Sequence, residues 1–393
     1  MKGFGLGTLT VAALLLAACG SQAQPAASAS APSAPAKPAA SAQAAAPASG
    51  ATQAKSSWDD VVAAANKEGA VTAISVGPAT VRQDLTDAFE KRYPQIKVDI
   101  QMMPPSGPTP KLMTEFAAKK VTTDMTMVGV NGDIPLMDAG ALDDLHPYLV
   151  GPDIDESKQL NGKWHWADNG SKYMLVFSAY VKLAWAYPAS GVDGSQFKSW
   201  KDMLDPRWKG KIIMGDPTTP GAGSAMAAYW YLSPELGKPF VDQFFKQQDV
   251  KFSRDDQQMI NAVGHGESLI GIGISDTILA DDIAKGLPIK VQPAANLTEK
   301  PYVTAGTGVL TVNKGAPHPN AAKVYINWFL SAEGQGYWSK ATSVPSYRQD
   351  APHEGVMDVM VPKPGKDYFE TQAEDFARKQ TEAGQYVKTL VNL

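Results

Sequence analysis

The sequence is poor in cysteine and carries no large excess of charge. Its 393 residues include a single cysteine, Cys19, so no disulfide can form within the chain. The 36 lysine and arginine residues nearly balance the 40 aspartate and glutamate residues, which leaves a net charge of −4. That balance supplies neither the basic surface that nucleic acids require nor a basic face for binding membranes. We therefore expect no nucleic-acid partner.

The motifs of several enzyme classes are also missing. Residues 214–230, MGDPTTPGAGSAMAAYW, are glycine-rich, but no lysine follows Gly221 or Gly223 as a phosphate-binding loop requires. Neither G-x-G-x-x-G nor G-x-S-x-G occurs, and the 5 histidines form no H-E-x-x-H pair. An enzyme would need an acid–base cluster, for which only Asp133 and Asp276 are candidates. We expect no enzymatic activity, no cofactor and no metal.

Long apolar runs are few, and the one at the N-terminus is short. Lys2 precedes the apolar residues 11–16, and small residues follow them, which is typical of a secretory signal over residues 1–18. The sequence Leu16-Ala17-Ala18-Cys19 resembles the bacterial lipobox. The resemblance implies cleavage before Cys19 and lipidation of its thiol. We expect an extracytoplasmic protein anchored to the membrane by lipid, facing either the periplasm or the exterior.

Residues 19–56 are predicted to be a linker. Beyond Cys19 they are mostly Ala, Pro, Ser, Gln and Gly, which lack the apolar bulk that would offset the entropy of ordering. The globular part begins sharply at Ser57, which is followed three residues later by Asp60, a helix-capping pattern. Gly69 is predicted to end this first helix.

The rest of the chain alternates between strand and helix patterns, so it belongs to the α/β class. Predicted strands cover residues 71–76, 97–103, 124–129, 211–214, 267–274, 289–292 and 309–312, with helices between most of them. This order predicts parallel sheets with helices on both faces, and ligands beyond the carboxyl ends of the strands. The loops at 76–80 and 128–133 lie at such ends.

Residues 214–230 fit that arrangement. A strand ends, Thr218 and Thr219 follow, and a helix begins near Gly221. The free backbone N–H groups of a helix N-terminus favour an anion, and glycine allows a ligand to approach the backbone closely. The alternative is an ordinary capped helix with no ligand, and the residues alone leave both open.

Four longer segments carry a family resemblance: SWDDVVAAANKEGAVTAISV, FEKRYPQIKVDI, SWKDMLDPRWKGKIIMGDPTTPGAG and AGTGVLTVNKGAPHPNAAKVYINWFLSAEGQ. They resemble the extracellular solute-binding proteins of ABC importers, in the branch that takes ferric iron, thiamine and phosphonates. The resemblance implies a type II periplasmic-binding-protein fold, in which two hinge strands join two α/β lobes. Lobe one would be residues 57–175 and 305–393, and lobe two residues 176–304. The crossings would lie near 173–177 and 302–309.

The resemblance also implies a site between the lobes, and a function. The protein would capture a small polar, anionic solute as a monomer and deliver it to ABC permease subunits. Arg82, just past the first loop, would add positive charge, and residues 343–348 resemble a family segment near the cleft. The residues implied to bind solute are Ser75, Gly77, Pro78, Thr80, Asn131, Thr218, Thr219, Gly221, Gly223, Ser224, Ser275 and Asp276.

One departure from the family pattern bears on the solute. Iron-binding members carry adjacent tyrosines just after the strand that here ends at Ile274, where this chain has Ser275 and Asp276. Without these phenolates, ferric iron becomes the alternative solute rather than the expected one. Asp276 would act either as a single hard ligand or as a hydrogen-bond acceptor. A ligand-sensing protein of the same fold is a further alternative.

Overall fold

The computed structural model describes residues 57–391, so the predicted signal, linker and lipidated Cys19 lie outside the described residues. The first helix, α1 (Trp58–Glu68), forms as predicted. The Ser57 hydroxyl accepts a hydrogen bond from the Asp60 N–H at 3.2 Å, and the Asp60 carboxylate accepts one from the Ser57 N–H at 3.2 Å. Gly69 ends the helix at φ 70°, where a side chain would be strained.

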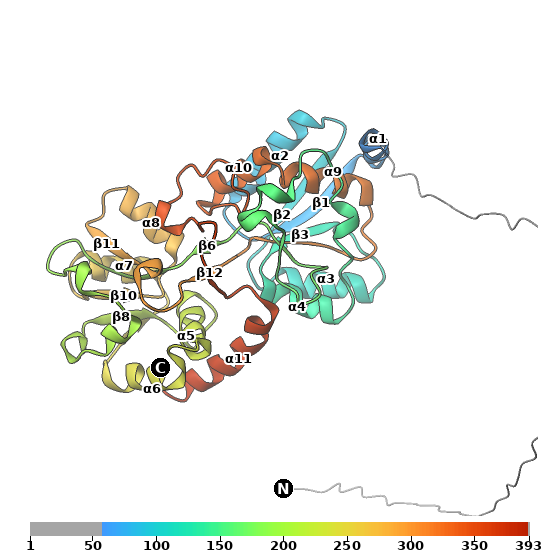
Figure 1. The fold of residues 1–393 in the computed structure, drawn as a ribbon. Coiled ribbons are helices and arrows are strands. Elements are labelled where there is room, and N and C mark those ends of the chain that lie inside the picture. Colours follow the sequence, from blue (N-terminus) through green and yellow to red (C-terminus); the bar gives the residue numbers. More distant parts are fainter. Residues whose placement is uncertain (1–56, 392–393) are drawn as a thin grey trace, which may run out of the picture. The chain divides into compact units, whose positions relative to one another are not determined.

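Lobe one is built on a six-stranded sheet in the order β2-β1-β3-β13-β5-β4 (Figure 1). β2, β1 and β3 run parallel as predicted, but β13 is antiparallel to β3 and β5, so the predicted parallel sheet is in fact mixed. The chain re-enters this lobe from the hinge, and β13 therefore runs away from the edge where β1 and β3 end. The strands are β1 (Ala70–Ser75), β2 (Lys97–Met102), β3 (Met125–Val128), β4 (His165–Trp166), β5 (Leu175–Val176) and β13 (Val309–Val312).

Helices cover both faces of this sheet. One face packs against α1, α2 (Ala79–Arg92), α9 (Pro319–Phe329) and α10 (Ala332–Thr342), around buried Phe89, Phe329 and Trp338. The other packs against α3 (Pro108–Ala117) and α4 (Val130–Asp138), which contribute Leu112 and Leu136. The sequence indicated a loop over 128–133, but α4 already begins at Val130.

Lobe two holds a five-stranded sheet in the order β11-β7-β10-β8-β9. β10, β8 and β9 are parallel, while β7 runs antiparallel to both β10 and β11. Its core is aromatic, with Trp185, Trp200 and Trp230 fully buried. The elements are β7 (Leu183–Pro188), β8 (Ile212–Gly215), α5 (Ala222–Leu232), α6 (Gly237–Gln247), β9 (Lys251–Ser253), α7 (Asp256–Gly264), β10 (Ile270–Ile272), α8 (Asp276–Ala284) and β11 (Ile289–Pro293).

A three-stranded sheet joins the lobes. Its order is β14-β12-β6, formed by β6 (Tyr180–Val181), β12 (Tyr302–Thr304) and β14 (Phe369–Glu370). The first crossing lies after residue 177, later than the predicted 173–177, because Leu175 and Val176 still pair within the lobe-one sheet. β14 adds a third strand that the sequence did not indicate, and it pairs in parallel with β12.

The C-terminal helix α11 (Glu374–Lys388) follows β14 and contacts both α4 of lobe one and α5 of lobe two (Figure 1). The predicted division at 57–175 with 305–393, and 176–304, stays a prediction. Short 3-10 helices occupy 146–148, 156–158, 160–162, 194–196, 200–204, 206–208, 294–296 and 358–360. Within the described residues, no helix combines the length and apolar character that crossing a bilayer requires.

Candidate solute site between the lobes

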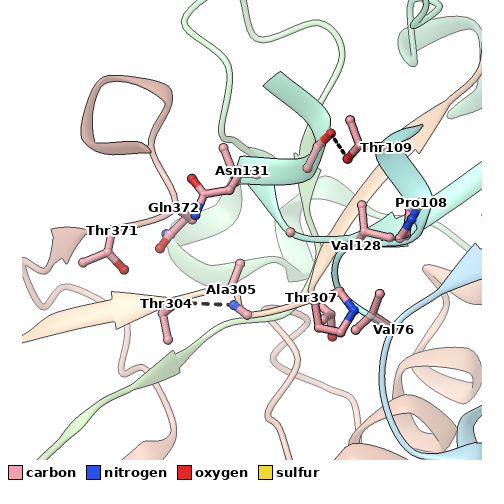
Figure 2. Close-up of a pocket in the computed structure, with 15 residues that line it drawn as sticks. Val76, Pro108, Thr109, Val128, Asn131, Thr304, Ala305, Thr307, Thr371 and Gln372 are labelled. Carbon is pink, nitrogen blue, oxygen red and sulfur yellow. Dashed lines mark hydrogen bonds between the residues drawn. The ribbon is translucent and has the colours of Figure 1, made fainter. Parts of the chain in front are cut away.

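A pocket of about 220 Å³, which we call the hinge pocket, lies where lobe one meets the hinge. β1, β3 and β12 all end beside it, and the first turn of α4 forms part of its wall. Figure 2 shows Asn131 and Gln372 at one side and Val76 and Thr307 at the other. The lining residues are Val76, Pro105, Pro108, Thr109, Val128–Gly132, Thr304–Thr307, Thr371 and Gln372.

The hinge pocket is uncharged and combines apolar side chains with polar groups. Threonine hydroxyls, two side-chain amides and the first backbone groups of α4 provide its polar atoms. The Thr109 hydroxyl donates to the Gly132 carbonyl at 2.9 Å, which ties α3 to the start of α4. No aspartate, glutamate, lysine or arginine lines the pocket. It therefore suits an uncharged polar group better than an ion.

A larger cavity of about 720 Å³, the inter-lobe cavity, adjoins the hinge pocket through Asn131, which lines both. Its walls come from the start of α4, the loop between β8 and α5, and one face of α11. It contains two cationic side chains and no carboxylate. The lining residues are Asn131, Ile134, Pro135, Pro217–Pro220, Ser224, Ala377, Arg378, Gln380, Thr381, Gly384, Gln385 and Lys388.

The loop between β8 and α5 is held in place by a buried carboxylate. Asp216 Oδ1 accepts hydrogen bonds from the Thr218 N–H at 2.7 Å and the Thr218 hydroxyl at 2.6 Å, and Oδ2 pairs with Arg254 Nε at 2.7 Å. Burial alone would raise the pKa of Asp216, but these contacts outweigh it and lower the pKa to about 2. Among residues 57–391 the Thr219 hydroxyl has no such partner. The loop therefore presents Thr219 from a rigid frame.

Four of the predicted solute-binding residues, Asn131, Thr218, Thr219 and Ser224, line the inter-lobe cavity together. The other eight line neither this cavity nor the hinge pocket. That any of the twelve binds solute stays a prediction. Of the other eight residues, some are exposed, some half-buried and some buried.

The exposed ones lie at the starts of helices. Gly77, Pro78 and Thr80 precede or begin α2, and the Thr80 hydroxyl donates to the Ala341 carbonyl of α10 at 3.3 Å. Gly221 precedes α5, where its N–H donates to the Ser224 hydroxyl at 3.1 Å. This contact caps the helix and also occupies Ser224.

The others are partly or fully covered by their surroundings. Ser75 and Gly223 are buried in strand and helix packing. Ser275 is half-buried, and its N–H donates to Asp256 Oδ1 at 3.1 Å. Ser75 and Gly223 are covered by packing, and the Ser275 N–H is hydrogen-bonded, so in this structure these three residues hold the neighbouring loops in place.

Asp276 lies within lobe two and is paired with Lys182. The carboxylate Oδ2 contacts the Lys182 ammonium, and Oδ1 accepts the Leu183 N–H at 3.0 Å. Asp276 is 2% and Lys182 5% exposed. Burial alone would lower the pKa of Lys182, but the adjacent Asp276 carboxylate outweighs it and raises the pKa. The carboxylate thus fixes the start of α8 to the strand leaving the hinge.

Asp133, the other acidic residue that the sequence singled out, is also buried rather than exposed in a cavity. It faces the interior from α4 with 0% exposure, and among residues 57–391 neither of its carboxylate oxygens has a hydrogen-bond partner. Burial raises the pKa of Asp133 well above its ordinary value and outweighs the nearby Thr126 hydroxyl, which acts in the opposite direction. Asp133 therefore stays protonated to a higher pH than an exposed aspartate does.

Replacing Asp133 with asparagine should change how stability depends on pH. The pKa of Asp133 is raised in the folded protein, whereas in the unfolded chain it is about 3.9. Above that pH the unfolded chain binds fewer protons than the folded protein. The free energy of unfolding of the wild type therefore falls as the pH rises. The loss should approach about 1.4 kcal/mol per pH unit, and Asp133→Asn should lack it. Urea unfolding of both proteins at pH 4, 5, 6 and 7 measures this difference. Parallel profiles for the two proteins would contradict the assignment.

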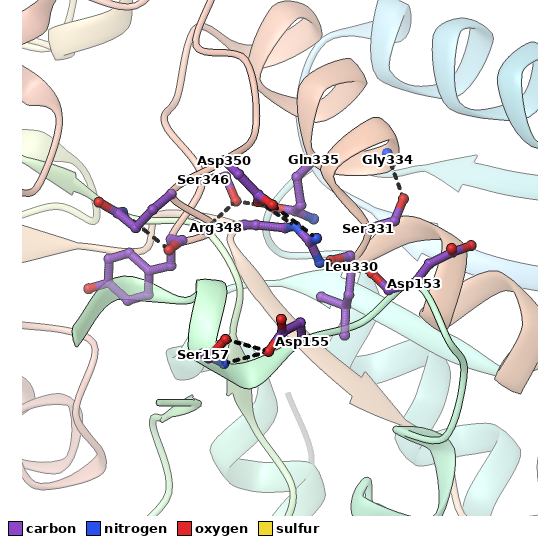
Figure 3. A network of polar contacts seen from close by, with 12 residues as sticks. Asp153, Asp155, Ser157, Leu330, Ser331, Gly334, Gln335, Ser346, Arg348 and Asp350 are labelled. Atoms are coloured by element: carbon purple, nitrogen blue, oxygen red, sulfur yellow. Dashed lines mark hydrogen bonds and ion pairs between the residues drawn. The ribbon is translucent and has the colours of Figure 1, made fainter. Parts of the chain in front are cut away.

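Residues 343–348, the segment that resembles a family motif, lie against the hinge. The Tyr347 N–H donates to the Phe177 carbonyl at 3.0 Å. Arg348 is buried, and its guanidinium contacts Asp350 Oδ1 at 2.7 Å, the Asp153 carbonyl at 2.9 Å and the Leu330 carbonyl at 3.2 Å (Figure 3). This network anchors the segment to lobe one, so the segment supports the hinge instead of lining either cavity.

Sequence reasoning did not find several lining residues. Thr109 belongs to a segment with no motif. Residues 304–307 lie in the predicted second crossing but were not proposed to bind solute, and α11 was predicted only as a helical tail. The one local signal in α11 is Gly384, because a glycine inside a helix is unfavourable and often has a role in packing or function.

The arrangement of two lobes with cavities at their junction agrees with the comparisons with known proteins. The family described as "Bacterial extracellular solute-binding protein" matches residues 84–361, more than half of the chain. The chain belongs to this family of bacterial extracellular solute-binding proteins. Its members bind solutes for transport, and the fold is that of the type II periplasmic binding proteins of ABC importers.

Among solved structures, this solute-binding protein is similar to a Trichodesmium protein in complex with iron and citrate, at a TM-score of 0.64 and 18% identity, covering 82% of this chain and 99% of that one. It is also similar to a periplasmic binding protein from Actinobacillus pleuropneumoniae with fructose 6-phosphate bound, at a TM-score of 0.57 and 16% identity, covering 82% and 99%. At such low identities these likenesses establish the fold alone.

An uncharacterized protein of Haemophilus influenzae is 30% identical over 152 residues, which are 37% of this chain. The matched part spans 41% of that relative's length.

Within residues 57–391, no cluster of three or more His, Cys, Asp or Glu side chains is arranged to hold a metal ion.

Proposed function

We propose that this solute-binding protein captures a small, polar, anionic organic solute between its lobes and delivers it to the permease of an ABC importer, without catalysis. The observation that carries the proposal is the inter-lobe cavity, which holds about 720 Å³ and is lined by no carboxylate, by Arg378, which is paired with Asp138 and Glu374, and by Lys388. That volume suits an organic molecule, and that charge suits an anion.

Contacts around the cavity support an anionic group at the start of α5. The loop carrying Thr219 leads into this helix, whose N-terminal end is favourable for negative charge. Asp216, the nearest carboxylate of this loop, is already neutralised by Arg254 and by hydrogen bonds from Thr218. The Asp216 carboxylate therefore repels a bound anion only slightly.

The absence of catalysis is supported by the two acidic candidates. Asp133 is buried on the inner side of α4, and the Asp276 carboxylate is paired with Lys182. Neither lines the hinge pocket or the inter-lobe cavity, so no acid–base pair faces a bound solute there.

Ferric iron is the alternative solute, since one solved structure of the same fold holds iron with citrate. Ferric iron prefers anionic oxygen ligands, and no tyrosine, aspartate or glutamate lines either cavity. We further propose that Cys19 is lipidated, that the monomeric protein is held at the membrane outside the cytoplasm, and that it acts in transport rather than as a sensor. Copurification with permease subunits would support transport, and copurification with a receptor would support sensing.

A ligand screen tests the proposed solute class. Thermal denaturation and tryptophan fluorescence should be followed with citrate, fructose 6-phosphate, fructose, a phosphonate, amino acids, thiamine, polyamines and ferric chloride. We expect an organic anion to raise the melting temperature, by the equivalent of about 2.7 kcal/mol at 100 times its Kd, with no product formed. The Thr219→Val variant should bind the same anion more weakly. Stabilisation by ferric chloride alone, or product formation at enzymatic rates, would contradict the proposal.

A further inference from the structure

The C-terminal helix α11 is fixed to both lobes. Near its start, Glu374 Oε2 accepts the Asn169 N–H of lobe one at 2.9 Å, and Arg378 pairs with both oxygens of Asp138 at 3.0 and 2.6 Å. Near its end, the Tyr386 hydroxyl donates to Asp242 of lobe two at 2.5 Å. The helix thus spans the junction of the lobes at a defined position.

One face of α11 forms a wall of the inter-lobe cavity. Because residues three and four apart lie on the same side of a helix, the lining positions form a continuous stripe. The adjacent side packs into the protein through Phe376, Ala383 and Val387, all buried. The stripe consists of Ala377, Gln380, Thr381, Gly384, Gln385 and Lys388, with Arg378 at its border.

Gly384 leaves space at the centre of this wall. A glycine inside a helix costs about 1 kcal/mol relative to alanine. Close packing does not account for it, because a Cβ built on Gly384 meets no atom within 4 Å. Since Gly384 lines the cavity, the missing side chain widens the cavity at that point.

Lys388 places a cation on the same wall. It is exposed and, among the residues that the structure describes, forms no ion pair, whereas Arg378 is already paired with Asp138 and Glu374. Thr218 and Thr219 line the same cavity from lobe two. At the other end, Asn131 Nδ2 donates to Gln380 Oε1 at 2.9 Å and joins this wall to the hinge pocket.

We propose that α11 is a specificity-determining wall of the solute site, in which Gly384 sets the length of the solute and Lys388 pairs with its anionic group. The solute would then carry a phosphate, phosphonate or carboxylate toward Lys388 and an uncharged polar portion toward the hinge pocket. This inference rests on the proposed function, because it assigns a specific element to recognition of the same solute.

Three variants of the full chain test the wall. Lys388→Gln removes the charge, Gly384→Phe fills the open space, and Lys379→Gln removes a charge from α11 outside the inter-lobe cavity. Calorimetric titration should use whichever of citrate, fructose 6-phosphate and a phosphonate binds wild type, at 50 and 300 mM salt. We expect about 10-fold weaker binding and a smaller salt dependence for Lys388→Gln. Gly384→Phe should lose at least about 10-fold, and Lys379→Gln should match wild type.

The outcomes separate this inference from the proposed function. Wild-type affinity in both Lys388→Gln and Gly384→Phe would overturn the role of α11 and leave an anion-binding protein. An equal loss in Lys379→Gln would also overturn it, because a general effect of charge would then explain the result. If no anion binds wild type, the proposed function fails and this inference with it. In the absence of solute, Gly384→Phe should unfold at the same temperature as wild type. A lower unfolding temperature would contradict the conclusion that the space beside Gly384 is open.

Discussion

Replacing Asp276 with asparagine should lower the free energy of unfolding by about 3–5 kcal/mol. The substitution keeps an oxygen for the Leu183 N–H but leaves the buried Lys182 ammonium without a counter-charge. An unpaired charge in the protein interior keeps its desolvation cost and loses the attraction that offset it. Urea unfolding monitored by tryptophan fluorescence measures the change.

A double variant distinguishes charge from shape at this site. Lys182→Met together with Asp276→Asn removes both charges and should recover most of the stability, since an uncharged pair needs no compensation. Lys285→Met provides the surface control, because Lys285 pairs with Asp282 at 3.3 Å while 74% of its side chain is exposed. That variant should change stability by about 1 kcal/mol or less. A small loss in Asp276→Asn, equal to the control, would contradict the buried pair.

Replacing Gly223 with alanine should destabilise the protein by about 3 kcal/mol and weaken solute binding. A Cβ at Gly223 would lie 2.1 Å from the Gly215 carbonyl oxygen and 2.4 Å from its carbon. These are backbone atoms at the end of β8, so α5 would have to move away from the sheet. Because α5 follows the loop that presents Thr219, the inter-lobe cavity would change as well. Chemical unfolding and the ligand screen measure the two effects.

Gly384→Ala is the matched control for this change, since both glycines lie within helices. With no atom within 4 Å of its added Cβ, alanine at Gly384 should leave stability unchanged or raise it by up to about 1 kcal/mol. Equal stability losses in Gly223→Ala and Gly384→Ala would contradict the close contact between α5 and β8. Normal solute binding by a destabilised Gly223→Ala would show that the contact serves folding only.

Local signals in the sequence predicted much of the secondary structure. The Ser57 and Asp60 capping pattern and Gly69 defined α1 almost to the residue, because these interactions involve groups within a few positions of one another. The same reasoning missed α4 and α10. In α4, Gly132 and Pro135 disguise the helical pattern, because Pro135 lies inside the helix, where proline is normally disfavoured. In α10, Gly334 and Gly336 weaken it in the same way.

The site shows the limit of local reasoning more clearly. Thr218, Thr219 and Ser224 lie in the loop and helix that follow β8, so their place at the carboxyl end of a strand, beside the inter-lobe cavity, could be predicted from strand order. The engagement of Asp276 could not, because its partner Lys182 is 94 positions away. The sequence therefore predicted Asp276 as a possible ligand, whereas in the structure it is buried and paired with Lys182.

By itself, the sequence determined the α/β class, the restart of the strand–helix pattern in a second lobe and the resemblance to solute-binding proteins. These depend on the order and spacing of nearby residues. Only the tertiary structure decided that β13 runs antiparallel in lobe one, that Asp133 and Asp276 are buried, and that α11 lines the cavity. Each of these depends on contacts between segments far apart in the chain, such as Asn131 with Gln380. Hydrophobic packing and charge pairing select such contacts only once the lobes have assembled.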